Sequence, residues 1–275
     1  MREHSGSPSS LVASLVSNRA LIARMTRRDV IARYKGSFVG LAWSFFNPIL
    51  LLIVYTFVFS VVFQARWGDD RFGADGNGSL AVMIFSGMIV HGLFSECFMR
   101  SPELITGNAN FVKRVVFPLE ILPWVNMGSA IFHLCVSLLV LLVGQYVISG
   151  VVQPTALLAP VALAPLVLFT MGISWLVSAT GVYFRDLAQA SGIVSTTMLF
   201  LSPVFYPLSI VPEDARAWFY LNPLTYVIEM LRDLVVFGTL PAATPYIAYC
   251  AASAVVAWLG YAWFQKTRRG FADVL

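Results

Sequence analysis

The stretch that decides the fold runs from Ile121 to Phe184: ILPWVNMGSAIFHLCVSLLVLLVGQYVISGVVQPTALLAPVALAPLVLFTMGISWLVSATGVYF. These 64 consecutive residues contain no Asp, Glu, Lys or Arg. A helix that crosses a bilayer needs about 20 apolar residues, so the run is too long for one crossing. Ser149-Gly150 and Gln153-Pro154 interrupt it with residues that are typical of turns. The stretch therefore predicts two membrane helices, over 121–148 and 156–182.

Outward from this stretch, four further uncharged runs are long enough to cross a membrane. They predict spans over 39–63, 80–98, 188–210 and 244–264. The composition agrees, because 58% of the residues are hydrophobic and only 12% are charged, against about 25% charged in a soluble domain. A soluble globular protein, a disordered chain and a nucleic-acid-binding domain are excluded, despite the net charge of +4. We predict an all-α integral membrane protein with six transmembrane helices.

The basic residues predict the orientation of these spans. The N-terminal segment, the loops over 99–120 and 183–187 and the C-terminal tail together hold 14 Lys and Arg residues, whereas the opposite loops hold 4. Cytoplasmic loops carry the excess of positive charge, so both termini are expected in the cytoplasm. The apolar stretch Leu11–Val16 is too short for a signal peptide. The expected organisation is a cytoplasmic segment over 1–38, a six-helix membrane domain over 39–264 and a cytoplasmic tail over 265–275.

Two segments outside the spans are also expected to be helical. Residues 11–34 place apolar side chains among five arginines, which is typical of an amphipathic helix in the headgroup layer; the alternative is a loosely ordered basic tail. Residues 211–240 contain two short helix signals, separated by Asn222-Pro223 and ended by Gly238. Each piece is too short to span the bilayer, so we expect re-entrant or interfacial helices on the extracytoplasmic side. Glu229 and Arg232 are spaced to pair on one face.

Several kinds of chemistry are missing from the sequence. No lysine follows a glycine, so the phosphate-binding loop G-x-x-x-x-G-K-[ST] is absent, and no hydrolase or zinc motif occurs. Cys97, Cys135 and Cys250 are too far apart for a disulfide framework and are expected to be buried thiols. His91 and His133 fit either a proton relay or two neutral, hydrogen-bonded histidines. The chain therefore resembles a transport pathway whose motor is another subunit.

The loop best suited to contact such a motor runs from Arg100 to Pro118. Ser101, Pro102 and Glu103 are typical of a helix N-terminus, with a cap, a proline at the first position and an acid in the first turn. They predict a short helix over 103–110, followed by the basic pair Lys113-Arg114. The alternative is an ordinary connecting loop.

At this point the sequence resembles a known family: the permease of type-2 ABC exporters of polysaccharide, which covers O-antigen, capsule and teichoic acid export. The matching stretches are RRDVIARYKGSFVGLAWSFFNPIL, FVKRVVFPLEILP, YFRDL, SPVFYPLSIVP, NPLTYVIEMLRD and FADVL. They extend from about residue 20 to the C-terminus in the family's order.

The resemblance implies a role for several sites. Residues 19–35 would be the interface helix, residues 103–111 a coupling helix seated on the ATPase, and YFRDL a second contact with it. The implied ATPase-coupling residues are Glu103, Leu104, Ile105, Asn108, Phe111, Lys113, Arg114, Arg185 and Asp186. Residues 213–238 would be paired gate helices, with Glu213, Arg216, Glu229, Arg232 and Asp233 as gate residues.

The resemblance also implies the partners and the location. Members work as homodimers with two copies of a separate ATPase subunit, which binds ATP and Mg; this chain itself is expected to hold no cofactor and no metal. The substrate would be a lipid-linked polysaccharide, and the location the bacterial cytoplasmic (inner) membrane, in contact with its lipids. Two alternatives stay open: a type-2 exporter of small drugs or antibiotics, and a membrane-embedded enzyme acting on lipid-linked sugars.

Aromatic residues in two spans suit such a substrate. They are Trp43, Phe46, Tyr55 and Phe59 in the first span, and Phe200, Phe205 and Tyr206 in the fifth. Sugar rings pack their apolar C–H faces on aromatic rings, so these side chains are candidates to line a channel. The alternative is that they face lipid or lie at the membrane interface.

Overall fold

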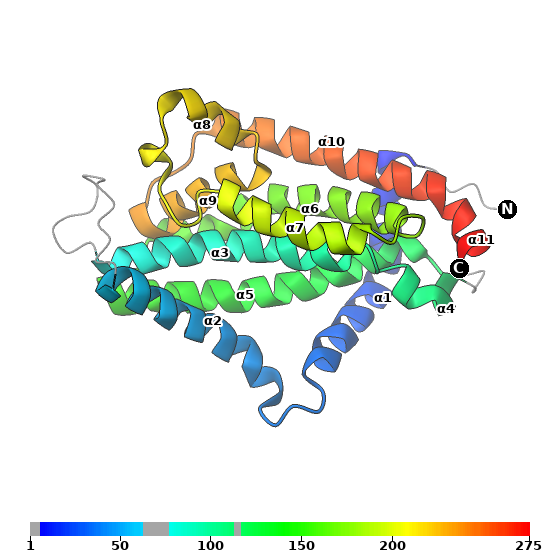
Figure 1. Cartoon of the computed structure of the whole chain (residues 1–275), viewed down its shortest axis with the longest axis horizontal. Helices are drawn as coiled ribbons and strands as arrows, with labels where there is room; N and C mark the ends of the chain where they lie inside the picture. Colours follow the sequence, from blue (N-terminus) through cyan, green and yellow to red (C-terminus); the bar gives the residue numbers. More distant parts are fainter. Residues whose placement is uncertain (1–5, 63–76, 113–116) are drawn as a thin grey trace.

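The computed structural model describes residues 6–62, 77–112 and 117–275. Within these ranges every regular element is a helix, as predicted. Most of the long helices lie side by side and form an elongated bundle (Figure 1). The C-terminus and α4 lie at one end of this bundle, and α8 lies toward the other. We call these the terminal end and the distal end.

Five helical stretches in the described ranges are long and apolar enough to cross a membrane. They are Gly40–Phe59, Leu80–Arg100, Leu119–Ser149, Pro154–Gly181 and Ala243–Val274. They contain α2 (Trp43–Tyr55), followed by a π-helical segment over Thr56–Val62, then α3 (Asn77–Arg100), α5 (Leu122–Ser149), α6 (Ala159–Gly181) and α10 (Ala243–Thr267). The predicted turn after Ser149 is confirmed: Gly150 ends α5 with a φ of 72°, which suits glycine.

The prediction of one continuous span over 188–210 is wrong in its extent. Helix α7 covers Leu187–Leu201, only 15 residues. It stops because Pro203 follows Ser202, and the residue before a proline avoids the helical conformation; Ser202 has an extended ψ of 150°. Asn222 then donates a hydrogen bond to the Ser202 hydroxyl at 2.9 Å. The chain after α7 is thereby tied to the start of α9 rather than prolonging the helix.

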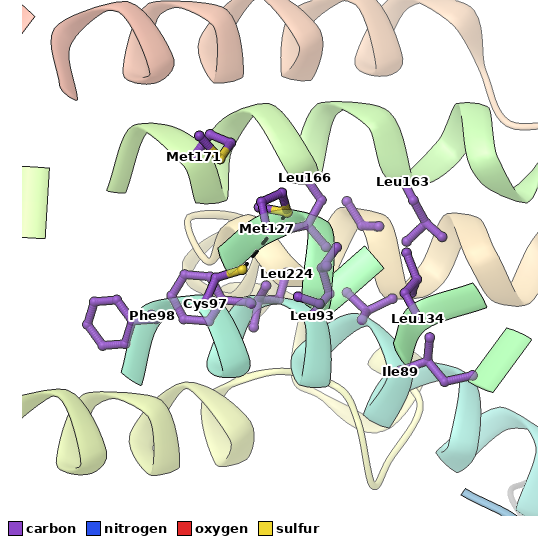
Figure 2. Packing of buried hydrophobic residues seen from close by; sticks show 14 of the residues in the cluster. Ile89, Leu93, Cys97, Phe98, Met127, Leu134, Leu163, Leu166, Met171 and Leu224 are labelled. Carbon is purple, nitrogen blue, oxygen red and sulfur yellow. Dashed lines mark hydrogen bonds between the residues drawn. The ribbon is translucent and has the colours of Figure 1, made fainter. Parts of the chain in front are cut away.

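The main core lies between α3, α5, α6 and α9. Figure 2 shows Leu93 and Cys97 of α3 among Met127 of α5, Leu166 of α6 and Leu224 of α9. The Cys97 thiol lies 3.9 Å from the Met127 sulfur. The prediction of three buried cysteines therefore holds for Cys97. It is wrong for Cys135, which is exposed on the outer face of α5, and Cys250 is only half-buried.

Helices α6 and α10 pack closely because two glycines face each other. A Cβ added to Gly260 would lie 1.9 Å from the Gly172 carbonyl oxygen, and one added to Gly172 would lie 2.4 Å from the Val256 carbonyl oxygen. No side chain fits at either position, so the two backbones are in direct contact. Small residues allow this approach between apolar helices.

The first helix runs in a different direction from the bundle. Helix α1 (Pro8–Tyr34) lies across the bundle axis rather than along it (Figure 1). Ser7 caps it by accepting the Ser10 backbone N–H at 3.3 Å. Val30 is its one buried residue, and Arg24, Arg27 and Arg28 are exposed. The predicted helix over 11–34 is therefore present in the structure.

The last loop holds two short helices, as predicted. Helix α8 (Glu213–Tyr220) has no buried residue. Helix α9 (Pro223–Arg232) starts with an Asn222 cap, is buried on most faces and continues as a π-helical segment to Phe237. Gly238 ends it with a φ of 69°. The pair is thus unequal: α9 belongs to the core, and α8 lies outside it.

Candidate functional site

The loop between α3 and α5 lies at the terminal end of the bundle. The predicted helix over 103–110 is wrong, because residues 101–105 form turns, a 3-10 turn covers Thr106–Asn108, and α4 is only Ala109–Val112. Ser101 is no cap: its fully buried hydroxyl donates back to the Cys97 carbonyl at 2.6 Å and lies 3.0 Å from the Ser174 hydroxyl. The side chain that would start a helix is thus bonded to α3 and α6. We call residues 101–118 the coupling loop.

The coupling residues inferred from the resemblance divide into inner and outer positions. Ile105 is fully buried, and Leu104 and Phe111 pack against the main core. Asn108 donates to the Leu104 carbonyl at 2.9 Å and so shapes the loop from within. Glu103 is exposed, as are Gly107 and Asn110 of the same loop. The outer surface therefore belongs to these three positions; Lys113 and Arg114 lie outside the described residues.

The second predicted contact, the 183–187 loop, adjoins the coupling loop. Arg185 and Asp186 are exposed, and Asp186 stands at the start of α7 without capping it through its side chain. A Cβ added to Gly181 would lie 2.3 Å from the Pro102 carbonyl oxygen, so the coupling loop rests on the end of α6. The structure thus brings both predicted contacts to one end of the molecule.

Two charge clusters attach α1 to the bundle. Arg100 donates two hydrogen bonds of 3.1 Å to the Asp29 carboxylate, and Ser129 donates a third at 2.7 Å. Burial raises the pKa of Asp29, but these hydrogen bonds favour its charged form more strongly, so its pKa lies below the usual value. In the second cluster, Arg33 lies 2.7 Å from the Glu96 carboxylate. These pairs fix the angle at which α1 meets α3 and α5.

The two histidines have separate partners in the described structure. His133 lies 3.0 Å from the Glu96 carboxylate, and its Nε2 is hydrogen-bonded to the Tyr34 hydroxyl at 2.9 Å. His91 is hydrogen-bonded to the Ser195 carbonyl oxygen at 3.0 Å. Each histidine is therefore hydrogen-bonded to partners of its own. Sequence reasoning missed the roles of Asp29, Glu96 and Tyr34, because their partners are distant in the sequence. Arg100 is 71 residues from Asp29, and His133 is 99 residues from Tyr34 and 37 from Glu96.

Two of the predicted gate residues, Arg232 and Glu229, form a pair in which the arginine is buried. Arg232 is 2% exposed and pairs with Glu229 at 2.7 Å, which confirms the predicted pairing. Its guanidinium also donates to the Met83 carbonyl at 3.3 Å and to the Val204 carbonyl at 2.9 Å. Arg232 thus fastens α9 to α3 and to the chain after α7.

The other gate residues lie nearer the surface. Arg216 lies 3.7 Å from the exposed Glu213 carboxylate and donates to the Val211 carbonyl at 2.9 Å. Asp233 is half-buried, and its backbone carbonyl accepts the Thr239 N–H at 2.9 Å. These contacts are local to the two ends of the α8–α9 segment.

The predicted channel-lining aromatics form one continuous group and one separate pair. The ring of Phe59 stacks on Phe205 at 6.5 Å, with Tyr55 at 6.4 Å on one side and Phe200 at 6.0 Å from Phe205 on the other. The Tyr206 hydroxyl donates to the Phe200 carbonyl at 2.8 Å. Trp43 and Phe46 pair with each other at 6.1 Å near the start of α2 and are exposed. The structure thus brings together aromatics from the predicted first and fifth spans.

These features define a class of protein. Long apolar helices form a bundle whose loops at one end are folded into a fixed surface. In the described parts of the chain, no group of three or more His, Cys, Asp or Glu side chains is placed to hold a metal ion. The class is a helical integral membrane protein.

Comparison with known proteins gives the family. Residues 20–236 match the model of the ABC-2 type transporter family, and the chain belongs to this family. It is similar to the O-antigen export system permease protein RfbA of Myxococcus xanthus, with 30% identity over 96% of this chain and 98% of that protein. An RfbA of Klebsiella pneumoniae is 26% identical over 93% of this chain and 95% of its own length. The polysialic acid transport protein KpsM of Escherichia coli is 22% identical over 77% of this chain and 79% of its own length.

Proposed function

We propose that this chain is the membrane-spanning permease of an ATP-driven exporter that moves lipid-linked polysaccharide, of O-antigen or capsule type, across the bacterial cytoplasmic membrane. The observation that carries the proposal is the similarity to polysaccharide export permeases along almost the whole chain. The names of these relatives favour polysaccharide over a small drug as the substrate. They also favour a transport role over a membrane-embedded enzyme.

The chain crosses the membrane six times, with α7 as the short fifth crossing. The course of the helices supports this count: α6 runs toward the terminal end and α10 starts at the distal end, so the chain must return between them (Figure 1). Helix α7 makes this return, and its 15 residues rise about 22 Å. With 14 basic residues on the terminal side and 4 on the other, both termini are cytoplasmic. Helix α1 then lies in the headgroup layer, with its exposed arginines near lipid phosphates.

The permease works as a homodimer with two copies of an ATPase subunit, which supplies ATP and Mg. The absence of a phosphate-binding loop in the sequence supports a separate motor. Among the described residues of the coupling loop, Glu103, Gly107 and Asn110 are exposed, and they are the positions that contact the ATPase, together with Arg185 and Asp186. Helix α2 supports the dimer, because its aromatic and aliphatic side chains are largely exposed in the single chain.

The aromatic group Tyr55, Phe59, Phe200 and Phe205 forms part of the glycan path. A chain of sugars that slides through a channel needs many weak, equivalent contacts, and adjacent rings offer them. In the described structure these rings belong to two segments that are distant in sequence but meet at Phe59 and Phe205. The path therefore runs between the first and fifth crossings.

Reconstitution tests the proposal. The chain and its ATPase subunit are placed in proteoliposomes loaded on one leaflet with a lipid-linked polysaccharide, and the glycan that reaches the other leaflet is measured with a lectin. ATP should drive the transfer, and an ATPase variant without its catalytic glutamate should abolish it. Transfer of small drugs but not glycan would replace the proposal by the drug exporter, and glycan modification without ATP would replace it by the enzyme.

A further inference from the structure

The C-terminal segment, residues 268–275, is part of the folded core rather than a free tail. It consists of a 3-10 turn over Arg268–Gly270 and α11 (Phe271–Val274). The Phe271 ring is fully buried, 5.6 Å from Phe264 and 6.2 Å from Tyr183. Tyr183 donates its hydroxyl proton to the Thr267 carbonyl at 2.9 Å. The end of the chain is therefore packed against the 183–187 loop.

Arg268 joins this segment to the coupling loop. Its guanidinium forms an ion pair with the Glu120 carboxylate and donates a second hydrogen bond to the Phe117 carbonyl at 2.9 Å. The side chains of Arg268 and Glu120 are only 12% and 11% exposed. A pair so well enclosed is directional and holds a fixed geometry, and the loss of either partner leaves an uncompensated charge.

Glu120 connects two further elements at the same point. Its second carboxylate oxygen accepts the Ser14 hydroxyl of α1 at 3.2 Å, and its backbone carbonyl accepts the Trp175 indole N–H of α6 at 3.1 Å. Helix α1, helix α6, the coupling loop and the C-terminal segment therefore meet at one residue.

The coupling loop is fixed at both ends by these contacts. At its start, Pro102 rests on Gly181 at the end of α6. At its end, the Phe117 ring stacks on the ring of Phe111, which belongs to α4, at 4.3 Å and 11°. A displacement of α4 therefore acts on Phe117 and, through the Phe117 carbonyl, on Arg268. Arg268 directly follows the last residue of α10.

Resting on the proposed docking of the coupling loop on the ATPase, we propose that Arg268 and Glu120 are positioning residues that transmit the movement of this loop to α10 and α1. The apolar contacts at the terminal end can slide over one another, whereas the buried ion pair cannot shift without losing its geometry. Because α10 is in backbone contact with α6 at Gly172 and Gly260, the two helices move together. The ion pair thus links the ATPase contact to the membrane helices.

Arg268→Gln in the full permease–ATPase complex tests the proposal. The matched control is Arg269→Gln, which removes the same charge from the exposed neighbouring position. For each complex we measure the amount of ATPase that copurifies, the ATP hydrolysis rate and the glycan exported per ATP hydrolysed. Arg268→Gln should leave copurification unchanged and lower export per ATP by about two- to thirtyfold, the range for residues along a coupling path. The control should change none of the three.

A further variant covers the case in which Arg268→Gln does not fold. Arg268→Lys keeps the ion pair with Glu120 but loses the forked second bond to the Phe117 carbonyl. It should give an export-to-hydrolysis ratio between those of the native protein and Arg268→Gln. Unchanged export per ATP in both variants overturns the proposal, and so does loss of copurified ATPase in step with export, because that would make the pair part of the docking surface.

Gly107→Trp separates this proposal from the one on which it rests. A Cβ at Gly107 meets no atom within 4 Å, so the bulky side chain projects from the folded loop. It should prevent the ATPase from copurifying. If the ATPase binds as before, the docking assignment fails, whatever Arg268→Gln does; if Gly107→Trp blocks binding and Arg268→Gln leaves export per ATP unchanged, only the positioning role fails.

Discussion

At the scale of single residues, one charged side chain that contacts several elements is buried and forms several hydrogen bonds. Arg232 is held by Glu229 and by two backbone carbonyls from different elements. One carbonyl belongs to Met83 in α3, and the other belongs to Val204 in the turn after α7. A guanidinium is suited to this place because its five N–H groups satisfy several acceptors at once. The Arg232 side chain therefore links α9 to α3 and to the chain after α7.

Replacing Arg232 should lower the stability of the protein. Arg232→Met keeps most of the apolar volume but removes the Arg232 bonds to the Val204 carbonyl and to Glu229, while the Met83 carbonyl keeps the hydrogen bond from the Ser86 hydroxyl. We expect a loss of about 2–4 kcal/mol in the free energy of unfolding, toward the lower end because Glu229 is partly exposed and can be hydrated. Chemical unfolding in mixed micelles measures it. Arg216→Met, at a side chain that is 37% exposed, is the control, with an expected loss below about 1 kcal/mol; equal losses would contradict the argument.

At the scale of elements, close contacts and burial divide the molecule into fixed and exposed parts. Helices α6 and α10 form a fixed pair through their glycines. Helix α9 is fixed as well, since it is buried on most faces and fastened by Arg232. Helix α8 has no buried residue and contacts the rest of the distal end through side chains such as Phe219, whose ring lies 6.1 Å from Tyr206. Of the two predicted gate helices, α8 is therefore the less tightly packed.

The fixed pair predicts a strong effect of one methyl group. Gly260→Ala places a Cβ against the Gly172 backbone, which no rotamer change can relieve, so α6 and α10 must separate. We expect a loss of about 1–3 kcal/mol in unfolding free energy. Gly192→Ala on α7 is the control, because its Cβ meets no atom within 4 Å, and it should be neutral or stabilising by up to about 1 kcal/mol. A stable Gly260→Ala variant would show that the contact is not tight.

The exposed gate helix predicts a reversible block. In a cysteine-free background, cysteines at Tyr206 and Phe219, joined by a short disulfide-containing cross-linker, should stop export until the linker is reduced. The control joins α9 to α10 through cysteines at Tyr226 and Tyr249, whose rings are 5.5 Å apart, and should leave export unchanged. Full export with the α8 cross-link verified would make α8 a static cover.

At the scale of the whole molecule, the chain has two different ends. The terminal end gathers the coupling loop, the 183–187 loop and the C-terminal segment, and these are joined to one another by Pro102, Tyr183 and Arg268. The distal end holds α8, the turn at Gly150 and the start of α10. This polarity is what a transporter driven from one side of a membrane requires.

The polarity predicts the location of four reporter insertions. Reporters fused after Leu275 or inserted after Phe184 should be cytoplasmic, and reporters inserted after Val151 or Ala215 should be extracytoplasmic. The pair at Phe184 and Ala215 is the sharpest, because α7 is the one long helix between them. Accessibility to a membrane-impermeant thiol reagent measures each location. If Phe184 and Ala215 lie on the same side, α7 does not cross and the six-crossing count is wrong.

The sequence by itself determined the features that depend on local chemistry. Uncharged runs predicted α3, α5, α6 and α10 because a backbone in hydrocarbon must satisfy its own hydrogen bonds as a helix. Gly150, Asn222-Pro223 and Gly238 marked turns and breaks because their backbone preferences are intrinsic. The family motifs indicated the class of function because each motif is a short, contiguous stretch that can be read directly from the sequence.

Only the tertiary structure decided which side of each segment faces the core. Ile105 lies inward and Gly107 outward, α9 is buried and α8 is not, and Arg268 meets Glu120 across 148 residues of sequence. In a chain this apolar, the contrast between inside and outside is weak, because helices face lipid on one side and protein on the other. Hydrophobic pattern therefore located the helices, and close packing between distant segments determined their faces, their partners and the buried ion pairs.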